Sequence, residues 1–185
     1  MKPLILTSLI CALAQLTPML RAAEKAELES HASSYHAAGK AIVEMAITKK
    51  VDSTEVAKRV ETLVSDAIWM AKEYAKAKPK GERLLKVILE NVETMKKLSF
   101  KELEHEWHDL HHFDKADKDI GLDVKAEENE HFTDPIHSIV HPLLVLKAAE
   151  SFVSSKSEGD LKSIKEEMEE GLEQMEKQKD TLLKK

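Results

Sequence analysis

The stretch DSTEVAKRVETLVSDAIWMAKEYAKAK, residues 52–78, decides the fold class. Its apolar residues return every three or four positions, which places them on one face of an α-helix. That face consists of Val56, Val60, Leu63, Val64, Ala67, Ile68, Ala71 and Tyr74. Residues 52–55 have the spacing of a capping box, and Pro79 and Gly81 follow the last turn. The stretch therefore predicts an amphipathic helix with a marked start and end.

The same periodicity continues on both sides of this helix. Further helices are predicted at about 27–49, 82–98, 134–154 and 161–182, with a shorter one after the capping box at 99–102. The connections are mostly short, which favours antiparallel neighbours. We therefore predict an all-α protein, an up-and-down helical bundle of four long helices plus one or two short ones. It would form a single domain over residues 24–185, with an irregular acidic loop at about 113–133.

The first 23 residues are predicted to be a secretory signal peptide. Lys2 precedes an apolar run, Leu4–Leu20, and residues 12–14 offer a small-x-small cleavage pattern. A cut after Ala23 would give a more usual length, so the cleavage site stays open. The alternative is an uncleaved anchor, although the run is shorter than the ~20 residues that a membrane span needs. We expect a periplasmic or secreted protein with no stable membrane span after cleavage.

The net charge and the position of the cysteine argue against several classes of function. Removing Lys2 and Arg21 leaves 26 Lys and Arg against 34 Asp and Glu, a net charge of −8 (26 − 34) with His neutral. An acidic chain without a stripe of basic and aromatic residues is a poor nucleic-acid binder. The one cysteine, Cys11, lies in the predicted leader. The remaining chain would then have no disulfide, no thiolate metal site and no covalently attached c-type haem.

Histidines supply the main chemical signal. Seven of the nine fall within residues 105–141, at spacings of three or four that belong to one helix face. Imidazole is the commonest protein ligand for transition metals. The predicted metal site consists of His105, His108, His112, His137 and His141, with His111 and His131 in reserve.

Two helices would have to meet to complete this site. The pair His137 and His141 has the i, i+4 spacing at which two imidazoles can chelate one ion. Pro142 removes the helix hydrogen bond to the Ser138 carbonyl, and we expect a kinked but continuous helix. Zinc accepts such nitrogen ligands tetrahedrally, whereas copper and nickel prefer flatter geometry. Nearby carboxylates, among them Asp109, would be ligands or partners of the rings.

Three other functions stay open. One is a protein-interaction or structural bundle without metal, in which clustered histidines respond to pH. Another is a metal-dependent hydrolase that uses His108 and Asp109. The third is a non-covalent haem bundle, for which methionine ligands are available at Met45, Met70, Met95, Met168 and Met175. Because no nucleophile is evident, metal binding, buffering or sensing is favoured over turnover. Partners would be the metal ion and a further protein or a second copy of the chain.

Overall fold

The computed structural model describes residues 4–114 and 120–184, with side chains from Arg21 onward. The described part of the chain is almost entirely helical and contains no strand, so the all-α prediction is confirmed. Its four long helices are α1 (Leu4–Ile47), α2 (Ser53–Ala77), α6 (Asp134–Ser155) and α7 (Glu158–Leu183). Its shorter elements are η1 (Pro79–Gly81), α3 (Glu82–Met95), α4 (Phe100–Leu103), the π-helical turn η2 (Glu104–His108) and η3 (Glu127–Phe132).

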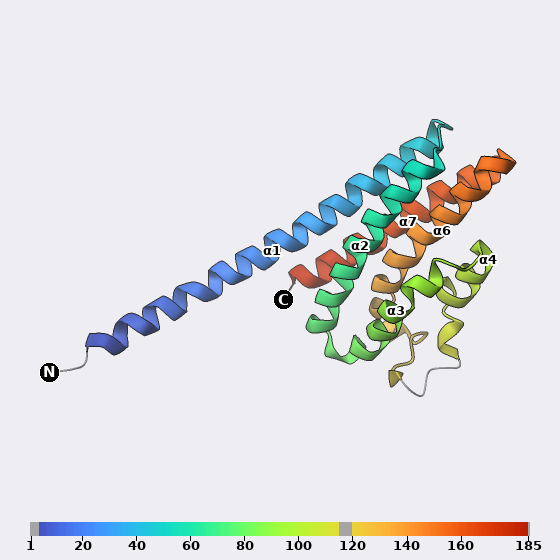
Figure 1. Ribbon diagram of the computed structural model, residues 1–185. Helices are drawn as coiled ribbons and strands as arrows, with labels where there is room; N and C mark the ends of the chain where they lie inside the picture. Colours follow the sequence, from blue (N-terminus) through green and yellow to red (C-terminus); the bar gives the residue numbers. More distant parts are fainter. Residues whose placement is uncertain (1–3, 115–119, 185) are drawn as a thin grey trace.

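The long helices pack around a shared core. Both α1 and α6 contact α2 and α7, and their axes run side by side in Figure 1. Between α2 and α6 the chain makes an excursion through α3, α4 and η2, which lies against α6. This excursion carries the first run of histidines to the helix that holds the second run. The topology therefore brings the two runs together, as the metal-site prediction requires.

Local signals at the start of the helices behave as predicted. The Asp52 side chain accepts hydrogen bonds from the backbone N–H groups of Thr54 and Glu55, at 2.9 and 3.2 Å. Ser99 and Glu102 form a reciprocal capping box. These contacts satisfy N–H groups that have no partner within the helix. On α2 the predicted apolar stripe is buried, except that Ile68 is only partly covered.

Helix α6 begins at Asp134, where the sequence predicts its start. Thr133 is the cap, without a side-chain hydrogen bond, and Asp134 is already the first helical residue. The Asp134 side chain is buried, with 8% of its surface exposed. Its burial raises the carboxyl pKa to about 6, because the charged form loses its hydration.

The described part of the acidic loop has more structure than its composition suggests. Among its described residues, the apolar side chains of Phe113, Ile120, Leu122 and Val124 are buried. Its second half forms the short helix η3. The buried Asn129 donates to the Asp123 carbonyl at 2.8 Å and accepts from Lys80 at 2.9 Å. The sparse apolar residues thus act as anchors, which a periodicity search does not detect.

One helix of the described chain, α6, is long and apolar enough by length and composition to cross a membrane. The sequence pattern predicts no such segment beyond the leader, so this prediction differs from the structure. In the folded protein 67% of the apolar window is buried. Helix α6 also contacts both α2 and α7, so its composition is that of the central core helix.

Candidate metal centre

The backbone divides the first run of histidines into separate groups. Its helix changes to π geometry in η2, where the Asp109 N–H donates to the Glu104 carbonyl at 2.8 Å. The chain then turns at Leu110, whose φ of 62° lies in the left-handed region. Because regular α-helical spacing ends here, the single face expected for His105, His108 and His112 is not formed.

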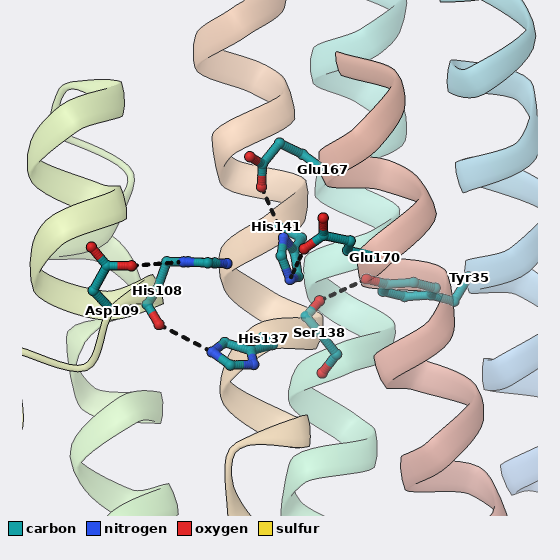
Figure 2. A network of polar contacts seen from close by, with 8 residues as sticks. All are labelled: Tyr35, His108, Asp109, His137, Ser138, His141, Glu167 and Glu170. Carbon is teal, nitrogen blue, oxygen red and sulfur yellow. Dashed lines mark hydrogen bonds and ion pairs between the residues drawn. The ribbon is translucent and has the colours of Figure 1, made fainter. Parts of the chain in front are cut away.

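One of these histidines, His108, meets the second run. Its ring centroid lies 5.1 Å from that of His141 and 5.3 Å from that of His137. The rings of His137 and His141 lie 5.6 Å apart on one face of α6. Figure 2 shows His108 reaching from the excursion toward α6. The expected meeting of the two runs therefore takes place through three of the five predicted residues.

Helix α6 stays continuous through Pro142, so His137 and His141 remain on the same face. Pro142 has no N–H to donate to the Ser138 carbonyl four residues earlier. The hydroxyl of Tyr35 on α1 donates to that carbonyl instead, at 2.8 Å (Figure 2). Tyr35 is fully buried, and its burial raises the pKa of the phenol well above the usual value. The predicted continuous helix is confirmed, and the His137–His141 pair survives with it.

Glutamates of α7 complete the surroundings of His141. This ring is almost fully buried, with 1% exposed, and its Nδ1 lies 2.9 Å from Oε2 of Glu167. Its Nε2 lies 3.8 Å from Oε2 of Glu170. A carboxylate that accepts from Nδ1–H selects the tautomer whose Nε2 carries a free lone pair. The contact with Glu167 thus prepares Nε2 of His141 as a metal ligand.

His108 repeats this arrangement on the other side. Its Nδ1 lies 3.1 Å from Oδ1 of Asp109, and the opposite edge of the ring faces α6 (Figure 2). One ligand atom from each of His108, His141 and Glu170 lies within 4.8 Å of the other two. We call these three residues, together with the neighbouring His137, the inner centre.

His137 stands beside these three residues with one nitrogen engaged. Its Nε2 lies 3.2 Å from the His108 carbonyl oxygen, so Nε2–H donates and Nδ1 keeps its lone pair. Burial lowers the pKa of His137 to about 4, because the charged form loses its hydration. This ring is therefore neutral at pH 7, the form that can bind a metal.

The other predicted ligands lie in different environments. His105 stacks on His111 with centroids 4.3 Å apart, and one ligand atom from each lies within 4.8 Å of an Asp109 oxygen. His112 stacks on the indole of Trp107 at 4.0 Å. The ring of His131, held in reserve, lies tilted against that of Phe132, with centroids 4.1 Å apart. Four of the five methionines considered for haem are buried in the core, and Met45 packs against it.

Sequence reasoning missed the two glutamates. Helix α7 carries glutamates on most of its surface, and Glu167 and Glu170 have no distinguishing neighbours in the sequence. Only the packing of α7 against α6 selects these two from the rest. Comparison of the chain with known protein families, with curated proteins and with solved structures found no match.

Proposed function

We propose that this protein binds a divalent transition-metal ion at the inner centre. The ligands are Nε2 of His108, Nε2 of His141 and the carboxylate of Glu170. The observation that carries the proposal is the buried His141 ring, whose Nδ1 is held by Glu167 while Nε2 faces Glu170. Such carboxylate–histidine pairs are the usual support of metal-bound imidazoles.

The donor set favours zinc, and copper or nickel next. Two imidazole nitrogens and one carboxylate oxygen leave a fourth tetrahedral position for Nδ1 of His137 or for water. Ligand atoms on a zinc ion lie roughly 3.3 Å apart, given metal–ligand distances of about 2.0 Å. The three donors already lie within 4.8 Å, so small side-chain rotations would close the site. The role that follows is metal binding, buffering or sensing.

We further propose that the chain is exported and that its four long helices form an up-and-down bundle. Among the α1 side chains that the structure describes, burial begins at Leu28, and residues 21–27 are exposed. In Figure 1 the first half of α1 extends beyond the other helices. Removal of a leader that ends near Ala23 would therefore leave the packed part of the molecule intact. This supports a periplasmic or secreted protein.

Calorimetric titration of the untagged, metal-free protein with Zn²⁺ tests the inner centre. We expect His141→Ala and Glu170→Gln each to weaken this binding by at least about tenfold, or about 1.4 kcal/mol. Glu169→Gln is the matched control, because Glu169 lies on the same helix and pairs only with Lys165 among the contacts described. Binding that is unchanged in both test variants would overturn the proposal and favour an interaction module without metal.

A further inference from the structure

The second group of ligand atoms lies on the outer side of His108. His105, Asp109 and His111 place one ligand atom each within 4.8 Å of the others. Their side chains are open to solvent, with 61%, 49% and 42% exposed. None of the three is a ligand of the inner centre. We call this group the outer site.

Two backbone irregularities assemble this group. A regular helix would separate His105 and His111 by six positions, which does not bring their side chains together on one face. The π-helical turn and the left-handed Leu110 fold the chain back, so that the two rings stack at 4.3 Å. A leucine in that conformation is strained and persists only where the surroundings enforce it.

The ring of His111, like those of His108 and His141, has a carboxylate beside its Nδ1. Its Nδ1 lies 2.7 Å from Oδ2 of Asp114, and the other carboxylate oxygen of Asp114 is held by Lys125. Nε2 of His111 is then the nitrogen that keeps a lone pair for a ligand.

We propose that His105, Asp109 and His111 form a second, solvent-exposed site for a divalent transition-metal ion such as Zn²⁺ or Cu²⁺. Two imidazoles and one carboxylate match the chemistry of the inner centre. Exposure leaves positions for water, so the outer site binds more weakly and exchanges its ion faster.

Asp109 couples the two sites, and this coupling rests on the proposed function. Its Oδ1 accepts from Nδ1 of His108, a ligand of the inner centre. An ion on Asp109 withdraws charge from that hydrogen bond and repels a second cation nearby. Each ion therefore weakens the binding of the other by the same factor, as linkage requires. The inner centre fills first.

Zn²⁺ titration of the full-length, untagged protein tests the outer site. Wild type should bind two equivalents, and His105→Ala/His111→Ala only the tighter one. Because these side chains are exposed, circular dichroism should show an unchanged fold. His36→Ala, a histidine on α1 that contacts Glu176, is the control and should keep both equivalents. Two equivalents in the double variant would overturn the outer site.

The variants separate this proposal from the proposed function. Loss of one equivalent in His141→Ala, with no change in the double variant, supports the inner centre alone and overturns the outer site. The reverse pattern supports the outer site and overturns the inner centre. Asp109→Asn tests the coupling: it should abolish the weaker equivalent and weaken the tighter one by about tenfold, the scale of a lost supporting carboxylate. An unchanged tighter equivalent would overturn the coupling.

Discussion

Individual side chains compensate for groups that the fold leaves without a partner. The Tyr35 hydroxyl donates to the Ser138 carbonyl in place of the N–H that Pro142 lacks, and so satisfies a buried backbone acceptor in α6. An unpaired buried carbonyl costs about 1–3 kcal/mol, more than the hydrogen bond itself contributes. One phenol therefore allows a proline to stand next to His141 without breaking the helix.

Tyr35→Phe should lower the free energy of unfolding by about 1–3 kcal/mol, because the Ser138 carbonyl loses its donor. Urea denaturation of the metal-free protein measures this change. The control is Pro142→Ala in the Tyr35→Phe background, which restores a backbone N–H for the same carbonyl and should recover much of the loss. Equal losses with and without the proline would show that the hydrogen bond is not the cause.

The buried Asp134 makes stability depend on pH. Its pKa of about 6 lies above the unfolded value of about 3.9, so the folded state holds the proton more tightly. Stability from this group is present below pH 4 and is lost as the pH rises toward 6. Asp134→Asn removes this loss. The change that it causes in the free energy of unfolding should therefore be more favourable at pH 7 than at pH 3.5, by about 2–3 kcal/mol. Urea denaturation of wild type and variant across this pH range measures the difference in unfolding free energy. A difference that does not change with pH would contradict the raised pKa of Asp134.

At the scale of elements, the contact between α6 and α7 sets the position of the inner centre. Gly171 lies on the face of α7 that meets His141. A Cβ atom added to Gly171 would lie 3.1 Å from Cβ of His141 and 3.1 Å from the Tyr35 hydroxyl. The glycine costs roughly 1 kcal/mol of helix propensity relative to alanine. In exchange, α7 approaches closely enough for Glu167 and Glu170 to reach the imidazole.

Gly171→Ala should weaken Zn²⁺ binding by about tenfold, because it displaces His141 from its supporting glutamates. Calorimetric titration measures the change. Gly39→Ala is a suitable control, since the nearest atoms to its Cβ would belong to the side chains of Leu172 and Met168, neither of which is part of the inner centre. Unchanged binding in Gly171→Ala would mean that the helix contact does not position the ring.

Some helices can be predicted from local sequence patterns, whereas others depend on tertiary contacts. The stripe and cap of α2 are local, so periodicity and spacing were enough to predict them. The π-helical turn around His105 and His108 departs from a sequence that reads as regular helix. Its form depends on packing with distant segments, such as the contact of His137 Nε2 on α6 with the His108 carbonyl oxygen at 3.2 Å. For the same reason His108, His137 and His141 were found by type and spacing, whereas Glu167 and Glu170 were not.

At the scale of the whole molecule, the inner centre joins three parts of the chain. His108 comes from the excursion, His141 from α6 and Glu170 from α7. A bound ion therefore holds the excursion against the long helices. Since the unfolded chain lacks this arrangement, ligand binding stabilises the folded state.

Zn²⁺ at about 100 times its dissociation constant should raise the free energy of unfolding by about 2.7 kcal/mol. Thermal and urea denaturation with and without Zn²⁺ measure this gain. Backbone hydrogen exchange should slow chiefly over residues 100–113, the part of the excursion that the ion ties down. In His108→Ala the gain should largely disappear, while the metal-free protein keeps its fold. A full gain in that variant would place the ion elsewhere.

The separation of these ligands along the chain has a consequence for the order of events in the cell. His108, His141 and Glu170 are 33 and 29 residues apart (141 − 108 and 170 − 141), and no two of the three share an element. On the proposed export route, a chain that crosses the membrane as an extended thread carries no assembled three-ligand site. It would leave the cytoplasm without its ion and acquire one only after folding. The metal it holds would then be set by the compartment in which the chain folds, rather than by affinity alone.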